Sequence, residues 1–357
     1  MTRAMAVLLL AAVPACTRVP ADNPTLTAID GLMVGHHTLA ERPTGCTVIL
    51  ADGLVVAGVS QRGSAPGTRE TDLLEPVNGA DRVDAVVLSG GSAFGLDVAN
   101  GVMRWIDEGH GPWALRPTDV PMVPAAVLID LWVGGKPSIR PGADCGYRAA
   151  AAASRARVPE GSVGAGAGAT VGKLTGLDRA MKGGIGSAAV TLPGGLRVAA
   201  LAAVNALGDV IDPASGAVVA GARADDGSLR DVRKLLRTGA PLQRTRVAEN
   251  TTLAVVATNA HLTKAEANRV ALMADAGIAR AVTPAHTTAD GDTVFALATG
   301  RWRGRADLDE IGALAADVLA EAIVRAVKQA TVVAGIPAAR DIKSGPDVYV
   351  QSRCHRR

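Results

Sequence analysis

Short strand-like runs dominate this chain as far as residue 258, and its clearest helix-like segments come after that point. Regular alternation of strands with helices, which would predict a parallel sheet, is weak. The pattern therefore predicts an α+β fold with layered sheets and helices on the outside. The strand-like runs cover residues 47–50, 54–59, 85–88, 188–192, 196–201, 253–258 and 294–298.

Turn and capping signals add detail to this outline. Residues 51–53, Ala-Asp-Gly, separate the first two runs and predict a hairpin turn. Helix-like sequence covers residues 96–105, and Thr263 with Glu266 has the spacing of a capping box, which predicts a helix start. The last helix is expected over about 308–328, with an apolar stripe at Ile311, Leu314, Val318, Leu319, Ala322, Ile323 and Val327.

The core must be built almost entirely from aliphatic side chains, because 48% of the residues are apolar and only 2% are aromatic. Small side chains let sheets and helices approach closely, and the 41 glycines point the same way or to many tight turns. Residues 223–249 differ, since they hold seven basic and four acidic residues with little apolar periodicity. We expect them to form an exposed connection that ends directly before Thr251.

Charge and ligand patterns exclude several classes of protein. The net charge is only +3 and no basic stripe with aromatic residues occurs, which argues against nucleic-acid binding. The four cysteines, Cys16, Cys46, Cys145 and Cys354, lack the spacing of metal ligands, and in a chain of this size we expect no disulfide framework. No histidine lies in a metalloprotease motif. We therefore expect no metal and no cofactor.

Two glycine-containing segments resemble catalytic motifs but fail in detail. The run at 162–172 leads into Lys173, yet a phosphate-binding loop needs Gly and Ser or Thr where this chain has Ala167 and Leu174. A closely packed loop is the better interpretation. Ser92 is no nucleophile elbow, because Phe94 occupies the position of the last glycine. Ser92 is expected to be a turn residue or a helix cap.

The N-terminal residues allow two interpretations. A basic lead and a short apolar run precede Cys16, so residues 1–16 resemble a lipoprotein signal in which that cysteine is lipidated. This would place the protein in the cell envelope. The alternative is an upstream extension of a cytoplasmic protein. In either case residues 17–26 are expected to form a linker, with a single catalytic domain over 27–357.

A polar segment runs straight into a buried strand at Asn250 and Thr251, and taken alone this is an ordinary strand start. Together with other segments, however, it resembles the family of L-aminopeptidase/D-esterase, β-peptidyl aminopeptidases and nylon-oligomer endohydrolase. The matching segments are 67–72, 88–95, 164–173, 182–186, 203–205, 250–253 and 290–300.

The resemblance implies a four-layer αββα sandwich, as in ornithine acetyltransferase and N-terminal-nucleophile hydrolases. It also implies that the chain cuts itself between Asn250 and Thr251 into chains 27–250 and 251–357, which stay associated. Thr251 would then be the nucleophile, and its freed α-amino group the general base. Such an amine has a pKa of about 8, closer to working pH than a lysine amine.

Other residues take their roles from the same resemblance. A charged Lys173 would lower the pKa of the Thr251 amine further. Asn205 would donate its amide N–H to the developing oxyanion. Asp290 and Asp292 would orient Thr251 and Lys173 through charge-assisted hydrogen bonds. Without the resemblance these residues would be interpreted as a solvated lysine, a turn cap and a tight turn.

One position departs from the family. Characterised members carry a tyrosine where this chain has Ile129, and Tyr147 cannot be assumed to replace it. The favoured function is hydrolysis of small peptides or other linear amides, by an aminopeptidase or a 6-aminohexanoate-oligomer hydrolase, in a tetramer of cleaved pairs. The alternative is an unprocessed, envelope-anchored binding protein of the same fold. A membrane association is expected only through Cys16.

The lipoprotein interpretation predicts that the mature protein partitions into detergent and that Cys16→Ser leaves it soluble. Mass spectrometry of the purified N-terminus checks this directly, because it detects both the removal of residues 1–15 and an added lipid. An unmodified Met1 in the cytoplasmic fraction would contradict the lipoprotein interpretation.

Overall fold

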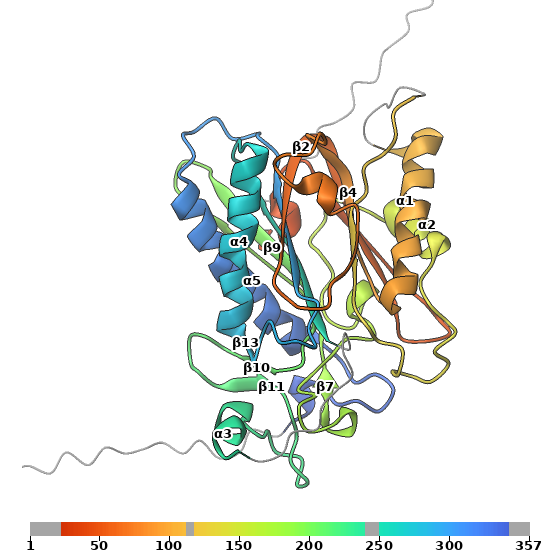
Figure 1. Ribbon diagram of the computed structural model, residues 1–357, viewed down its shortest axis with the longest axis vertical. Coiled ribbons are helices and arrows are strands. Elements are labelled where there is room, and N and C mark those ends of the chain that lie inside the picture. The colour runs from red at the N-terminus through yellow and green to blue at the C-terminus, as the bar shows by residue number, and fades with distance from the viewer. Residues whose placement is uncertain (1–22, 112–117, 240–249, 343–357) are drawn as a thin grey trace, which may run out of the picture.

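One long strand, β2 (Gly45–Gln61), connects the two sheets at the centre of the molecule (Figure 1). The structure, a computed structural model, describes residues 23–111, 118–239 and 250–342. The N-terminal part of β2 pairs with β1 and β4, and its C-terminal part pairs with β14. Because β2 takes part in both sheets, the large strands form one hydrogen-bonded path, with β1 as a branch on β2, that folds into two layers.

The first layer surrounds the N-terminal part of β2. It contains β1 (Leu32–Thr38), β3 (Gly67–Arg69), β4 (Val83–Ser89) and β5 (Ala125–Val127). Two helices, α1 (Val98–Trp105) and α2 (Ala143–Ala151), cover its outer face (Figure 1). Val48, Val87 and Val102 are among the buried residues that join these helices to the sheet.

The second layer runs from β2 through β14 (Thr293–Ala298), β12 (Thr251–Thr258), β9 (Arg197–Asn205) and β8 (Gly184–Thr191). Strand β12 is parallel to β14 and antiparallel to β9. The long helices α4 (Lys264–Ala281) and α5 (Leu308–Gln329) pack on the outer face of this layer (Figure 1).

A third apolar layer fills the space between the two sheets and contains Ile49, Leu88, Leu201, Leu253 and Phe295. The predicted four-layer αββα sandwich is therefore confirmed. The capping box at Thr263 and Glu266 is present, and the last helix begins at the predicted residue. Within the described ranges, no helix combines the length and the apolar character that crossing a bilayer requires.

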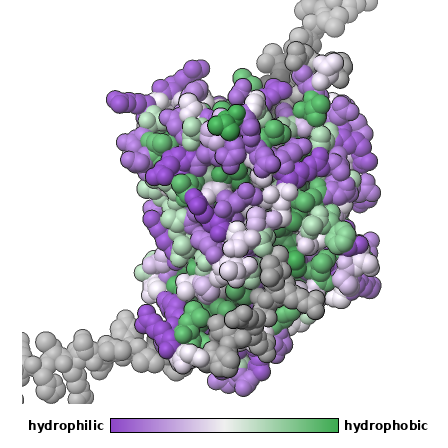
Figure 2. Space-filling model, viewed as in Figure 1, coloured by the Kyte–Doolittle hydropathy of each residue, from purple (hydrophilic) through white to green (hydrophobic). Residues whose placement is uncertain are grey.

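Smaller elements lie at one end of the sandwich (Figure 1). Strands β10 (Asp209–Ile211), β11 (Val218–Ala220) and β13 (Val282–Thr283) form a three-stranded sheet. Strands β6 (Thr170–Val171) and β7 (Met181–Lys182) form a pair. On the face shown in Figure 2, hydrophilic residues alternate with smaller hydrophobic areas, as on an ordinary protein surface.

The predicted hairpin at residues 51–53 is wrong, because β2 continues through them. Gly53 has a φ of +95°, and the pairing of β2 with β4 shifts between Leu50 and Val55. A glycine in this conformation lets a strand bulge and bend without ending it. The residues that carry the turn signal therefore mark the place where β2 passes from one sheet to the other.

Two further expectations need correction. Cys46 on β2 and Cys145 on α2 form a disulfide across 99 residues of sequence, a pairing that linear spacing could not indicate. The described end of the expected linker, residues 23–26, packs against the domain, since Leu26 is buried and its N–H donates to Ser187 Oγ. The rest of that linker, with Cys16, lies outside the described residues.

The connection expected over 223–249 is more ordered than predicted where it is described. It contains the short helix α3 (Val232–Arg237), whose first residue is buried beside Leu174 and Leu207. Asp209 Oδ1 and Oδ2 accept the backbone N–H groups of Ala222 and Val232 at 2.8 and 2.9 Å. Residues 240–249 lie outside the described part of the chain.

Close packing of α5 on β8 depends on Gly186. A Cβ atom at this position would lie 2.0 Å from the backbone oxygen of Ala322. We predict that Gly186→Ala lowers the free energy of unfolding by about 1–3 kcal/mol, because the helix must move away from the sheet. Gly79→Ala is the matched control, since a Cβ at Gly79 meets no atom within 4 Å. Urea denaturation of both variants checks this, and equal midpoints would contradict it.

Candidate active site

Thr251 is the first residue of β12, and its hydroxyl donates a hydrogen bond to the carbonyl oxygen of Asn250. Side chains alternate along a strand, so Thr251 shares a face with Leu253 and Val255. Those two residues belong to the core between the sheets. The Thr251 hydroxyl is therefore held at the end of the inter-sheet layer, and the residue is 3% exposed.

Asn205 lies directly opposite Thr251 in the pairing of β9 with β12. Its Oδ1 accepts the backbone N–H of Thr170 at 2.9 Å and the Lys173 ammonium at 3.1 Å. Its Nδ2 donates to the backbone oxygen of Ile129 at 3.0 Å. Because both partners of Oδ1 are donors and the partner of Nδ2 is an acceptor, the orientation of the amide is determined.

Lys173 is fully buried and lies beside the same asparagine. Its Nζ donates to the backbone oxygen of Asn205 at 2.9 Å as well as to Oδ1. The backbone N–H of Lys173 donates to Leu207 O, which fixes the chain at the base of the side chain. The alternative interpretation of Lys173 as a solvated lysine is therefore wrong.

The carbonyl group of Asn250 has a second donor. The backbone N–H of Gly291 donates to Asn250 O at 2.9 Å, and Asn250 forms a parallel bridge with Asp290. A Cβ at position 291 would lie 2.9 Å from Thr251 Oγ1 and 2.6 Å from Ala65 O. The glycine between the two aspartates thus makes room for the Thr251 hydroxyl.

The two aspartates do not have the contacts that we expected. Asp292 Oδ1 accepts the backbone N–H of Thr252, not Thr251, at 2.6 Å. Asp290 Oδ2 accepts the backbone N–H of Thr287 at 2.9 Å and its hydroxyl at 2.5 Å. Burial and the Asp292 charge raise the pKa of Asp290, whereas the Thr287 hydrogen bonds and the Lys173 charge lower it in part. Asp290 therefore acts on Lys173 through charge.

His286 and Asp275 were missed in the sequence. Nδ1 of His286 lies 2.9 Å from Asp292 Oδ2, and the His286 backbone N–H donates to the same oxygen at 3.1 Å. Asp275 on α4 is buried nearby, and burial raises its pKa to about 6. The sequence does show a histidine four residues before Asp290, but this spacing matches no known metal-binding or nucleophile motif.

The glycine-rich run before Lys173 surrounds another buried lysine, Lys182. The Lys182 ammonium donates to the backbone oxygens of Ala167 at 2.8 Å and Ala169 at 2.6 Å. A phosphate-binding loop presents N–H groups to its ligand, whereas this one presents carbonyl oxygens to a cation. Burial lowers the pKa of Lys182 to about 7, although the Asp130 carboxylate opposes that shift.

A buried ion pair supports the Ile129 carbonyl that holds Asn205. Arg42 donates to Asp130 Oδ1 at 2.8 Å and to the Asp130 backbone oxygen at 2.6 Å, and both side chains are fully buried. Thr44 Oγ1 and the Gly91 N–H complete the contacts of the carboxylate. Ile129, where the resemblance leads us to expect a tyrosine in the family, lies next to Asn205 and contributes its backbone oxygen.

Tyr147 does not replace that tyrosine. It lies on α2, in the outer helix layer, and its hydroxyl donates to Glu108 at 2.7 Å. Ser92 begins a 3-10 turn, as the turn prediction required.

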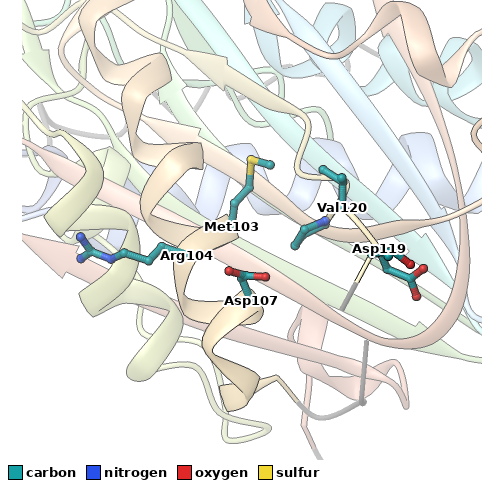
Figure 3. A pocket seen from close by; sticks show the side chains of 7 residues that line it. Met103, Arg104, Asp107, Asp119 and Val120 are labelled. Atoms are coloured by element: carbon teal, nitrogen blue, oxygen red, sulfur yellow. The ribbon is translucent and has the colours of Figure 1, made fainter. Parts of the chain in front are cut away.

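Three described cavities lie away from Thr251. One is a pocket of about 380 Å³ that is lined by Met103, Arg104 and Asp107 of the α1 region and by residues 118–121 (Figure 3). Two others have volumes of about 430 and 610 Å³. None of the three is lined by Thr251, Asn205 or Lys173. In the described ranges, no three His, Cys, Asp or Glu side chains are grouped as metal ligands.

A model of the family named Peptidase family S58 matches residues 24–340. An uncharacterized aminopeptidase of Mycobacterium tuberculosis is 42% identical over an alignment of 347 residues. The alignment covers 90% of this chain and 98% of the relative. The 6-aminohexanoate-oligomer endohydrolase of Kocuria sp. is 30% identical over 313 residues, covering 84% of each chain.

The fold has a counterpart among solved structures. The L-aminopeptidase D-Ala-esterase/amidase of Ochrobactrum anthropi, described as a variant of the Ntn hydrolase fold, superimposes with a TM-score of 0.62. The superposition covers 86% of both chains at 21% sequence identity. At this identity the likeness establishes the shared fold.

Proposed function

The chain belongs to peptidase family S58 and is a hydrolase of amide bonds, and we propose that it processes itself and then uses Thr251 as an N-terminal nucleophile. The observation that carries this proposal is the contact of the Thr251 hydroxyl with the carbonyl of Asn250, opposite Asn205. An ordinary strand start would not need a fully buried lysine beside it.

Self-processing begins with attack of Thr251 Oγ1 on the carbonyl carbon of Asn250. The new C–O bond forms, the C–N bond breaks, and the hydroxyl proton passes to the released amine. Negative charge develops on Asn250 O during the attack, and the Gly291 N–H at 2.9 Å is positioned to stabilise it. Water then hydrolyses the ester, which leaves a carboxylate on Asn250 and a free amine on Thr251.

Turnover uses the same hydroxyl on a substrate carbonyl. The Thr251 amine accepts the hydroxyl proton and later returns it to the leaving amine, and water releases the acyl group. Nδ2 of Asn205 donates to Ile129 O, which fixes the amide opposite Thr251, and we propose that this amide stabilises the oxyanion of the substrate. The Lys173 ammonium next to Asn205 favours the neutral form of the Thr251 amine by charge repulsion.

For the substrate class, we propose small peptides or other linear amides. The name of the mycobacterial relative supports an aminopeptidase, whereas that of the Kocuria relative supports internal cleavage of 6-aminohexanoate oligomers. The amine of Thr251 lies at the nucleophile itself, so the mechanism serves either substrate. We also propose that the cleaved pairs associate into a homo-oligomer, as the family resemblance implies.

The self-cut predicts two fragments, residues 1–250 and 251–357. The smaller one has a mass of about 11 kDa, in proportion to its share of the 36.1 kDa chain, and begins Thr-Thr-Leu-Ala-Val. Thr251→Ala removes the attacking hydroxyl, so this variant should remain one folded, inactive chain. Thr251→Ser keeps a hydroxyl and should retain some processing. Denaturing electrophoresis with N-terminal sequencing of the small fragment checks both.

The matched control for this experiment is Thr252→Ala. It changes the neighbouring hydroxyl but keeps the backbone N–H that Asp292 accepts, so the chain should still cut. Full activity of an uncut wild-type chain, or of Thr251→Ala, would show that the nucleophile assignment is wrong. An uncut wild-type chain without activity would favour the binding-protein alternative.

The proposed roles of Asn205 and Lys173 predict separate losses. Asn205→Ala should reduce kcat about 10²–10³-fold, the usual cost of removing one oxyanion donor. Lys173→Ala should slow both the self-cut and turnover, because the amine loses its neighbouring cation. Steady-state kinetics on an L-aminoacyl anilide and on 6-aminohexanoate oligomers, with electrophoresis for the cut, measure these effects.

Asn268→Ala provides the control for lost structural hydrogen bonds. Asn268 on α4 donates to Leu74 O at 2.9 Å and accepts the Val59 N–H, so it connects elements as Asn205 does. Its replacement should lower thermal stability and leave kcat close to that of the wild type. Near-normal turnover in Asn205→Ala or Lys173→Ala would remove that residue from the site.

A further inference from the structure

His286 lies against Asp292, the aspartate that contacts the nucleophile strand. Its ring Nδ1 and its backbone N–H both face Asp292 Oδ2, at 2.9 and 3.1 Å. The residue has a φ of +54°, a conformation that is uncommon for residues with a side chain. The surrounding structure thus holds His286 in a costly conformation that directs its ring toward a buried carboxylate.

The same carboxylate reaches the nucleophile strand. Asp292 Oδ1 accepts the Thr252 N–H at 2.6 Å, while Oδ2 faces His286. Thr252 follows Thr251 directly in β12, so a displacement of Asp292 would displace the hydroxyl that must attack Asn250. Asp292 is 98% buried, so water is excluded from its carboxylate. Protein groups such as His286 and the Thr252 N–H must therefore stabilise its charge and its position.

Charge explains why a histidine suits this position. Asp292 approaches His286 from the segment before β14, and Asp275 approaches it from α4. Arg62, whose side chain is half exposed, lies 3.9 Å from Asp275 on the far side. An imidazolium beside Asp292 compensates the charge of that carboxylate, which burial would otherwise make unfavourable.

We propose that His286 is a positioning residue whose protonated ring holds Asp292 against the Thr252 N–H and thereby aligns Thr251 for the self-cut and for turnover. This proposal rests on the proposed function of Thr251. It assigns His286 no contact with the substrate.

The proposal makes the reaction dependent on pH. Burial lowers the pKa of His286, but the adjacent Asp292 carboxylate, with the charge of Asp275, raises it above its ordinary value of 6.5. The aligned arrangement is therefore fully present below that ordinary value and is lost as the pH rises through the raised pKa. The rate should consequently fall on the alkaline side.

The test uses the self-cut as its readout, because the intact chain has no Thr251 amine whose titration could produce a similar change. Freshly synthesised full-length chain is followed by electrophoresis at a series of pH values. His286→Asn keeps a neutral donor near the position of Nδ1, and asparagine tolerates a positive φ. It should cut about tenfold more slowly near neutral pH, since the attraction between a charged ring and the Asp292 carboxylate is lost, and it should lose the alkaline decline.

Two further variants make the result specific. His261→Asn removes an exposed histidine before α4 and should match the wild type in rate and pH profile. Asp275→Asn removes a charge that raises the pKa of His286, so its alkaline decline should move to lower pH. This shift in direction tests the proposal even if His286→Asn fails to fold.

Two results would overturn the role of His286. One is a wild-type rate with an unchanged alkaline decline in His286→Asn, and the other is a decline in Asp275→Asn that stays in place or moves to higher pH. In both cases the wild-type chain would still cut at Asn250 and the Thr251→Ala chain would not, so the nucleophile assignment would stand. A wild-type chain that never cuts would overturn both proposals.

Discussion

Burial of β12 on both faces is the constraint on which the site depends. Every residue from Thr251 to Thr258 is buried, with one set of side chains against the helices and the other between the sheets. This leaves the strand no freedom to slip, because a shift of one residue would exchange the two faces. The start of the strand, and with it the Thr251 hydroxyl, is therefore located by the whole core.

The neighbours of β12 provide the remaining groups. Asn205 ends β9 on one side, and Asp290 to Asp292 lead into β14 on the other. Their places relative to Thr251 are set by strand pairing, which also holds Asn250 beside Asp290. The bond between Asn250 and Thr251 is thereby held next to fixed groups, an arrangement that favours a reaction within the chain over a reaction with water.

Three buried cations inside this sandwich have separate sets of oxygen partners. Lys173 contacts Asn205, Lys182 contacts the carbonyl oxygens of the glycine-rich run, and Arg42 contacts Asp130. Each buried cation has oxygen partners at hydrogen-bond distance, which offsets the cost of removing it from water. Lys182 and Arg42 do not reach Thr251. They hold the loops around Asn205 and so support the polar groups that lie next to Thr251.

Local signals in the sequence were sufficient for the elements that depend on neighbouring residues. The periodic stripe of α5, the Thr263 capping box, the buried strand after Asn250 and the aliphatic character of the core all follow from short-range patterns. The site residues themselves came from a family resemblance, because a lysine, an asparagine and two aspartates have no local signature of catalysis. The tertiary structure alone decided that β2 continues through Gly53, that Cys46 joins Cys145, that Asp292 holds Thr252, and that His286 lies against Asp292. The physical reason is that pairing and burial between distant segments determine these contacts, whereas propensity and periodicity act over a few residues.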